Sequence, residues 1–332
     1  MLIPFSLLLV IFLALVFEFI NGMRDSSNIV ATMISSRAFH PQTALGITAV
    51  AEFFGPLLFG VTVAKTIGSD IVASEVISLQ ALTVGLVGAI LWNLITWYFG
   101  IPSSSSHALI GGLIGAAVIS SGWEAVKPEG LLKVMLALFI SPVVGFVAGF
   151  ILLKIVYFFS QNATPHINNF FKQSQLFTAV TLAFSHGTND AQKTIGIITL
   201  SLIIGGELKD FSVPLWVVLV SAGTMAAGTA LGGWRLIRTL GGKFYKIRPV
   251  HGFASQLTSG IVILGASAIG LPVSTTQVVS SSIIGVGASE RFGKVRWGVA
   301  GDILTAWLIT IPISAFFSAG IYWVLMFFNI SL

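Results

Sequence analysis

Two aspartates lie in matching strings of small and polar residues, one in each half of the chain. Residues 21–28 read Asn-Gly-Met-Arg-Asp-Ser-Ser-Asn, and residues 186–193 read His-Gly-Thr-Asn-Asp-Ala-Gln-Lys. Asp25 and Asp190 therefore hold the same position, 165 residues apart (190 − 25). Each string has a glycine three residues before the aspartate, where the backbone could unwind. A carboxylate with neighbouring amide and carbonyl oxygens suits Na⁺ or a proton, whereas a single copy would favour a helix cap.

Hydroxyl side chains gather after a proline at a second pair of matching sites. Residues 100–107 read Gly-Ile-Pro-Ser-Ser-Ser-Ser-His, and residues 270–277 read Gly-Leu-Pro-Val-Ser-Thr-Thr-Gln, an offset of 170 (270 − 100). Proline ends a helix and the hydroxyls can cap the next one, whose free N–H groups and positive dipole end favour an anion. Caps without a ligand are the alternative. The predicted anion-binding residues are Ser104, Ser105, Ser106, Ser274, Thr275 and Thr276.

Further polar residues fall in or beside apolar runs, where they are costly unless they function or pair. They are Glu18, Glu52, Asn93, Gln256 and Asp302. Arg24 and Lys193, inside the aspartate strings, are expected to pair with these acids or to meet the anion. Three histidines, at 107, 186 and 251, would titrate near neutrality. We rank them low, because a lone histidine is more often a hydrogen-bonded helix residue.

The composition indicates the environment in which these residues lie. The chain has 332 residues, 55% hydrophobic and 9% charged, with a mean hydropathy of +0.96. A soluble domain has about a quarter of its residues charged, so we predict an integral membrane protein. Its apolar runs are long, as helices need, rather than short and alternating as in a membrane barrel. The chain has no cysteine, which excludes disulfides and thiolate metal sites.

Long and short apolar segments alternate with the polar strings. Six are long enough to span a membrane: residues 2–20, 44–64, 79–99, 131–158, 213–232 and 299–328. The first of them is read as a spanning helix rather than a signal peptide, because it lacks a basic start and a cleavage site. Shorter runs flank the repeated strings: residues 108–120, 176–184, 194–205, 253–269 and 278–287. Short helices of this kind fit broken or re-entrant helices that line a cavity.

Loop charges predict the orientation of the two halves. Residues 234–249 and 288–297 are rich in Lys and Arg, so the positive-inside rule makes both cytoplasmic. They flank the second proline string, whereas mixed acidic and basic loops flank the first. The two copies would then face opposite ways, as inverted-topology repeats do. We expect a first repeat at 1–158, a short polar linker at 159–175 and an inverted repeat at 176–332.

Taken together, the paired strings resemble those of the inorganic phosphate transporter (PiT) family. The resemblance covers nearly the whole chain and rests on the two motifs in order. It implies an all-α polytopic membrane protein with two inverted repeats, broken or re-entrant helices at the midplane, and cation-coupled phosphate symport.

By position, several residues look like the family's functional residues. Asp25 and Asp190 resemble its paired signature aspartates, Glu52 its second-helix glutamate, and Ser104 and Ser274 its paired serines. The residues expected to bind or couple the cation are Asp25, Asn28, Glu52, Asn93, Asn189, Asp190 and Gln256. Asp25 and Asp190 would ligate Na⁺ if Na⁺ is the coupling ion, and both would also contact phosphate.

The sequence departs from the family pattern at four positions. Arg24 and Lys193 stand where the signature commonly has asparagine. Gln256 replaces a common glutamate and Gln277 a common histidine, which puts proton coupling through those two positions in doubt.

The leading hypothesis is a secondary active transporter in the plasma (inner) membrane that imports phosphate with Na⁺ or H⁺. Its partners would be phosphate, the cation and lipid, with no resident cofactor and no nucleic acid, and the sequence leaves a homodimer open. A sulfate permease of the same family is the alternative, and a passive anion channel is disfavoured by the paired acids. An intramembrane serine hydrolase is remote, because Ser106 and His107, or Ser185 and His186, are neighbours that rarely face each other on a helix.

Overall fold

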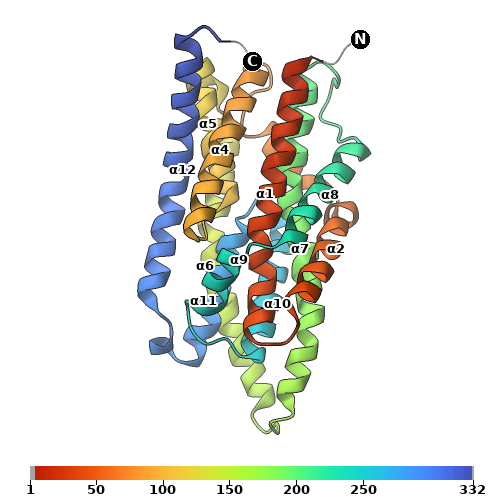
Figure 1. Ribbon diagram of the computed structural model, residues 1–332, viewed down its shortest axis with the longest axis vertical. Coiled ribbons are helices and arrows are strands. Elements are labelled where there is room, and N and C mark those ends of the chain that lie inside the picture. Colours follow the sequence, from red (N-terminus) through yellow and green to blue (C-terminus); the bar gives the residue numbers. More distant parts are fainter. Residues whose placement is uncertain (1–3, 331–332) are drawn as a thin grey trace.

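Helices make up the regular secondary structure of residues 4–330, the part of the chain that this computed structural model describes (Figure 1). The first half contains α1 Phe5–Ser35, α2 Pro41–Phe59, α3 Thr62–Ser69, α4 Leu79–Phe99, α5 Ser105–Ser121 and α6 Pro128–Ser160. The second contains α7 Ile167–Ile204, α8 Leu215–Leu231, α9 Trp234–Gly242, α10 Pro249–Ala268, α11 Thr275–Glu290 and α12 Trp297–Phe327. Short 3₁₀ turns, Trp123–Ala125 and Phe292–Lys294, precede α6 and α12. The predicted all-helical fold is confirmed.

Five of these helices are long and apolar enough to cross a membrane: α1, α2, α4, α6 and α12. A sixth span is obtained if α8 and α9, which meet at a 70° bend, are counted together. Many apolar side chains face outward along these helices, for example Phe316, which is 75% exposed. Because such side chains gain by contact with lipid rather than water, the chain is a multi-pass membrane protein.

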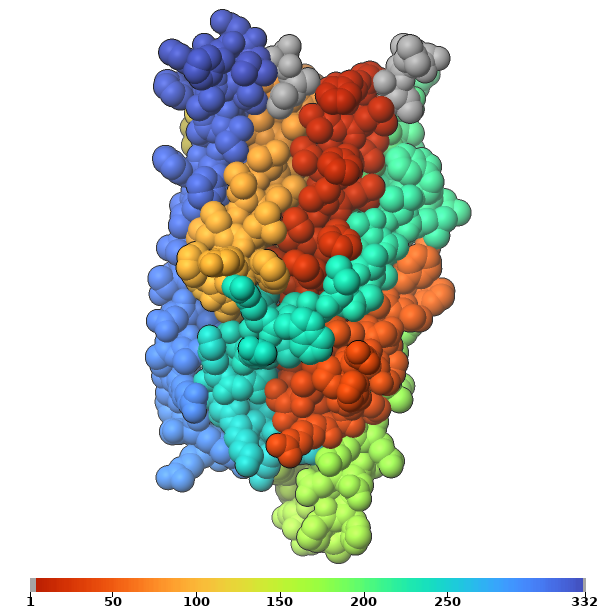
Figure 2. Space-filling model, in the orientation of Figure 1, coloured from red at the N-terminus to blue at the C-terminus, as the bar shows by residue number. Residues whose placement is uncertain are grey.

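The helices of the two halves run in opposite directions. In Figure 1, α1 descends from the N-terminal end of the molecule, whereas α7 ascends from the other end. The α4–α5 pair occupies the upper part and the α10–α11 pair the lower part. The last helix of each half packs on the other half, α6 along α11 and α12 along α5. Figure 2 shows α8 and α9 crossing the front of the molecule beside α1, so the two halves are interlocked.

Matching breaks divide α4 from α5 and α10 from α11. Gly100 ends the first helix of one pair with φ 67°, and Gly270 follows the end of the other with φ 71°. This left-handed backbone favours glycine, and the Pro two residues later prevents the helix from continuing. Ser104 and Ser274 then cap α5 and α11, because each side chain accepts the N–H three residues on. The predicted breaks and caps after the prolines are therefore present.

The aspartate strings, in contrast, do not unwind. α1 and α7 run without a break through Asp25 and Asp190, so the predicted role of the glycines is wrong. A Cβ at Gly22 would collide with the backbone carbonyl of Met225 in α8, and one at Gly187 with that of Glu52 in α2. These glycines let helices approach closely, which keeps both continuous helices tight around the aspartates.

Four other element predictions need correction. The run 44–64 is split, because Gly60, with φ 77°, ends α2 before α3 begins. The runs 176–184 and 194–205 belong to one helix, α7, since the polar string between them is helical. The stretch 234–249 is not all loop, because α9 buries an apolar face there and exposes its arginines. The connection between α6 and α7 comprises only residues 161–166, so it is shorter than the expected linker.

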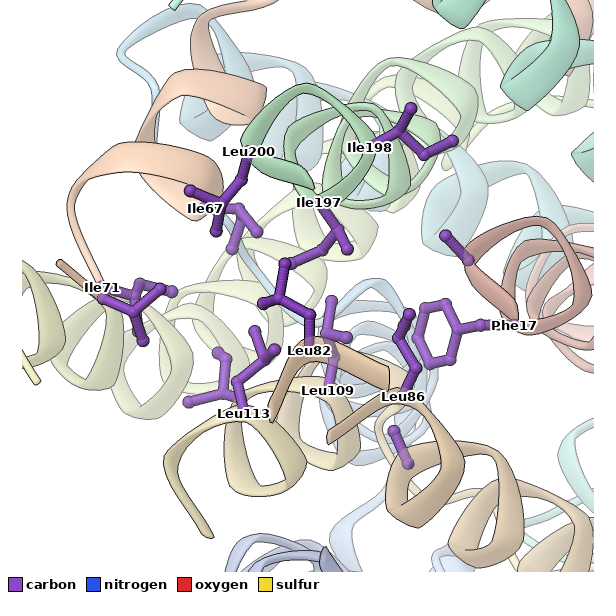
Figure 3. Close-up of a cluster of buried hydrophobic side chains, with 14 of the residues drawn as sticks. Phe17, Ile67, Ile71, Leu82, Leu86, Leu109, Leu113, Ile197, Ile198 and Leu200 are labelled. Carbon is purple, nitrogen blue, oxygen red and sulfur yellow. The ribbon is translucent and has the colours of Figure 1, made fainter. Parts of the chain in front are cut away.

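The two larger of three hydrophobic clusters among the described residues fill most of the interior, and a polar layer lies between them. One cluster, part of which Figure 3 shows, uses α1 up to Ile20 and α7 from Ala191 onward. The other uses α1 from Ile29 onward and α7 up to Ala183. Neither cluster includes residues 21–28 of α1 or 185–190 of α7, which form most of the two aspartate strings. Apolar side chains therefore lie on both sides of this buried polar layer along α1 and α7.

Candidate functional site

Asp25 accepts hydrogen bonds from hydroxyl groups of both halves of the chain. Ser105, at the N-terminus of α5, lies with its Oγ 3.3 Å from Asp25 Oδ2. Thr276, at the N-terminus of α11, lies with its Oγ1 3.3 Å from Asp25 Oδ1. Asn28 donates to the same Thr276 hydroxyl at 3.1 Å. The side chain of Asp25 thus joins α1 to the tips of both broken helix pairs.

Asp190 has a different and more basic set of partners. Thr275 donates from α11 to Asp190 Oδ2 at 2.8 Å. His186 Nε2 lies 3.1 Å from the same oxygen, one helical turn away on α7. Lys193, on the next turn, forms a buried ion pair with Asp190 Oδ1. Three nitrogen or hydroxyl groups therefore contact this carboxylate.

The two aspartates form one cluster with His186. A carboxylate oxygen of Asp25, a carboxylate oxygen of Asp190 and a ring nitrogen of His186 all lie within 4.8 Å of one another. The four repeated strings, far apart in sequence, thereby meet at one place. This convergence is the arrangement that the sequence led us to expect.

Glu52 extends the cluster toward α8. Its Oε1 lies 2.7 Å from His186 Nδ1, and its Oε2 accepts the hydroxyl of Thr229. Glu18 approaches from the other side, where its Oε2 accepts the hydroxyl of Thr194 at 2.5 Å. The sequence gave His186 a low rank, yet its ring bridges Glu52 and Asp190. The signal that could have found it is the spacing, since positions i and i+4 share a helix face.

Arg24 and Asn189 occupy the same position in the repeat and do similar work. Arg24 donates to the Ser103 carbonyl at 3.1 Å and to Asn93 Oδ1, so it holds the α4–α5 break. Asn189 donates to the Leu271 carbonyl at 3.3 Å in the α10–α11 break, and to Ser267 at 2.8 Å. Both side chains fix a hairpin tip against the helix that carries its half's aspartate.

The remaining predicted residues lie at different distances from the cluster. Ser106 donates to the Val273 carbonyl at 3.3 Å, so the two hairpin tips touch directly. Gln256 donates to Thr32 at 2.9 Å and accepts from Thr178 at 2.7 Å, and it makes no hydrogen bond to either aspartate among the described residues. Asp302 is exposed, so its predicted place among the buried polar residues is wrong.

Buried acids outnumber the buried fixed cations around the cluster. Four acids and two fixed cations are at most 1% exposed: Glu18, Asp25, Glu52 and Asp190 against Arg24 and Lys193. Ionisation of all four acids would leave two negative charges (4 − 2) before His186 is counted. Since a buried unpaired charge is costly, the site calls for protons or a mobile cation.

Orphaned oxygens give a cation its ligands. Asn28 Oδ1 and Asn189 Oδ1 are buried and accept no hydrogen bond from any described residue. Amide and carboxylate oxygens are the ligands that hard monovalent and divalent cations prefer. The donor set therefore fits Na⁺ as cargo. The hydroxyls and N–H groups at Ser105, Thr275 and Thr276 supply donors of the opposite kind, which suit an oxyanion.

The cluster is closed to both sides. Ser105 and Thr276 are each 3% exposed, and the aspartates no more than 1%. The site residues are therefore buried from solvent in this structure. Neither proposed hydrolase dyad forms, because Ser106 and Ser185 donate to backbone carbonyls and not to the histidine beside them.

Comparison with known proteins decides the family. The model of the phosphate transporter family matches residues 21–318. The chain belongs to the phosphate transporter family. Among curated relatives, the probable low-affinity inorganic phosphate transporter of Bacillus subtilis (strain 168) is 46% identical over 96% of both chains. The protein of the same name from Rhizobium meliloti (strain 1021) is 43% identical over 93% of both.

A solved structure resembles this fold over its full length. It is titled the sodium-dependent phosphate transporter, and it matches with a TM-score of 0.89 at 25% identity, covering 98% of this chain and 100% of that chain. The predicted family membership and the polytopic helical fold are thereby confirmed. The curated relatives named above are phosphate transporters.

Proposed function

We propose that this protein imports inorganic phosphate across the plasma membrane in symport with a cation. The observation that carries the proposal is the meeting of Ser105 and Thr276, from the two halves, on Asp25. The family and the named relatives favour phosphate over the sulfate alternative. The sodium-dependent structural relative supports Na⁺ as the coupling ion.

Phosphate would bind at the N-termini of α5 and α11. Ser104–Ser106 and Ser274–Thr276 offer hydroxyls and free backbone N–H groups there, and both helix dipoles point their positive ends at the same space. Hydroxyl donors hold an oxyanion without a fixed positive charge, so the anion can leave again. Asp25 and Asp190 accept hydrogen bonds from some of these hydroxyls, which phosphate would compete for.

The cation would bind among Asp25, Asn28, Asn189 and Asp190, with Glu52 acting through His186. A cation there offsets the excess negative charge and frees the hydroxyls for the anion. Each ion then raises the affinity for the other, and this reciprocal coupling is what symport requires. Asn93 and Gln256 would act indirectly, by holding α1 against α4 and α10.

Alternating access would come from the two halves, residues 1–158 and 176–332, acting as inverted repeats. The α4–α5 pair and the α10–α11 pair approach the site from opposite ends, so moving one pair would open one side. The basic stretches at 234–249 and 288–297 would face the cytoplasm.

The proposal is tested with the full chain purified and reconstituted into liposomes. Uptake of ³²P-phosphate is measured with Na⁺ and pH gradients imposed separately. Asp25→Asn and Asp190→Asn should each abolish accumulation, whereas Asp302→Asn, at an exposed acid, should leave it unchanged. Concentrative uptake that survives replacement of both buried aspartates would show the mechanism to be wrong.

A further inference from the structure

The two aspartates have matching positions but opposite neighbours. On α1, residues four before and three after Asp25 are Asn21 and Asn28; on α7, those around Asp190 are His186 and Lys193. Positions −4 and +3 lie on the same helix face as the aspartate, so each carboxylate has one neighbour above it and one below. One copy presents two amides and the other presents two basic nitrogens.

Around Asp25 the flanking oxygens are free. Asn21 Oδ1 and Asn28 Oδ1 are both buried and accept no hydrogen bond within residues 4–330. An unpaired buried acceptor is costly, and a cation bound at the Asp25 carboxylate would offer a partner to an amide oxygen beside it. No ammonium or guanidinium of the described residues forms an ion pair with Asp25.

Beside Asp190, the side chain of Lys193 occupies the position that corresponds to Asn28 beside Asp25. Lys193 is 1% exposed and its ammonium forms an ion pair with Asp190 Oδ1. It stands where the repeat has Asn28, whose amide oxygen is open. An ammonium group carries the same unit charge as a sodium ion, and here it is covalently tethered.

Arg24, the other permanently charged residue in the strings, does not form an ion pair with an aspartate. It stands opposite Asn189 in the repeat, and its guanidinium donates to Asn93 and Ser103, which are neutral. Its charge holds the α4–α5 break, as Asn189 holds the other break. Of the two fixed cations in the strings, only Lys193 therefore pairs with an aspartate.

We propose that Lys193 is a resident cation that fills one of two equivalent cation sites, and that the mobile cation binds on the Asp25 side, between Asn21 and Asn28. Lys193 would thus set the number of cations carried with each phosphate. This inference rests on the proposed symport and deepens it.

The test compares Lys193→Asn, which restores the amide of the other copy, with Lys193→Arg, which keeps the fixed charge. Full-length proteins are reconstituted with the membrane potential clamped at zero, and phosphate accumulation is measured at a 10-fold inward Na⁺ gradient. One additional coupled Na⁺ raises the limiting accumulation ratio about 10-fold, because each coupled ion contributes the free energy of its own gradient. We expect this gain in Lys193→Asn and none in Lys193→Arg.

A second experiment measures Na⁺ binding through thermal stability and does not require transport. Na⁺ should raise the melting temperature of detergent-solubilised Lys193→Asn more than that of the wild type, because a ligand that binds only the native state stabilises it. Lys193→Gln serves as a second amide variant in both assays.

Three outcomes would overturn the inference. They are unchanged Na⁺ dependence in both amide variants, a gain of Na⁺ dependence in Lys193→Arg, and failure to purify either amide variant when the arginine variant is stable. The last would make Lys193 only a structural counter-charge for Asp190. Failure of the wild type to accumulate phosphate under any gradient would instead refute the proposed function, so the two failures are distinct.

Discussion

Replacing Gly55 by alanine should damage the site without touching any polar group. Gly55 lies on α2, three residues after Glu52 and therefore on the same helix face. A Cβ at this position would lie 2.6 Å from the carbonyl oxygen of Phe184 and 2.6 Å from the backbone nitrogen of Thr188, both in α7. Helix backbone cannot turn aside as a flexible side chain can, so the two helices must separate.

The size of that separation follows from the contact distances. Ordinary contact begins at 3.4 Å, so α2 must move about 0.8 Å from α7 (3.4 − 2.6). The 2.7 Å contact between Glu52 Oε1 and His186 Nδ1 crosses the same interface and would lengthen to about 3.5 Å (2.7 + 0.8). That distance exceeds the range of an N–H···O hydrogen bond. His186 would then lose the partner that orients it toward Asp190.

We expect two measurable losses. Overpacking of this kind costs about 1–3 kcal/mol of stability, and the lost charge-assisted hydrogen bond about 1.5–3 kcal/mol. Displacing a positioned group by about 1 Å lowers activity by about 100-fold. Thermal unfolding in detergent and initial ³²P-phosphate uptake in liposomes measure the two effects.

The matched control is Gly46→Ala, also on α2, where an added Cβ meets no atom within 4 Å. It should retain the uptake and melting temperature of the wild type. If Gly55→Ala behaves in the same way as this control, the close approach of α2 and α7 does not position His186, and the reasoning is refuted.

Two further substitutions probe the hydroxyls and the helix break. Thr275→Val keeps the side-chain shape but removes the 2.8 Å hydrogen bond to Asp190, so phosphate uptake should fall about 10- to 100-fold, from the loss of about 1.5–3 kcal/mol. Thr181→Val, which removes an exposed hydroxyl bonded to its own helix, should have no effect, and equal rates in the two variants would contradict this assignment. Gly100→Ala should lower the free energy of unfolding by about 1–2 kcal/mol, because its φ of 67° is unfavourable for a residue with a Cβ. Denaturation midpoints measured beside Gly298→Ala, an open position, test this, and equal midpoints would argue against a left-handed break.

Local chemistry made several features readable from the sequence. Glycine before X-Pro, followed by serine, encodes a helix end and a new N-cap within a few residues, so both breaks could be predicted around Pro102 and Pro272. The apolar runs likewise identified the spanning helices α1, α4, α6 and α12, because burial in lipid is a property of composition and length. The duplication showed which polar residues hold matching positions in the two halves, such as Asp25 and Asp190.

Other features depend on contacts between segments far apart in the chain. Gly22 and Gly187 suggested local unwinding, but their neighbours are backbone atoms of α8 and α2, which no local pattern reveals. α7 crosses its polar string as one helix, because the groups of that string find partners on α2, α10 and α11 rather than in water. The role of His186 was missed for the same reason, since Glu52 reaches it from another helix.

The sequence by itself determined the membrane setting, the duplication, the broken helix pairs and the types of residue available for binding ions. These follow from composition and short-range backbone preferences, which act within one or two turns. Only the tertiary structure decided which side chains of the four strings touch, that His186 joins them, and that Lys193 rather than Arg24 pairs with an aspartate. Those outcomes depend on how closely separate helices approach, and packing sets that distance through residues that carry no charge at all.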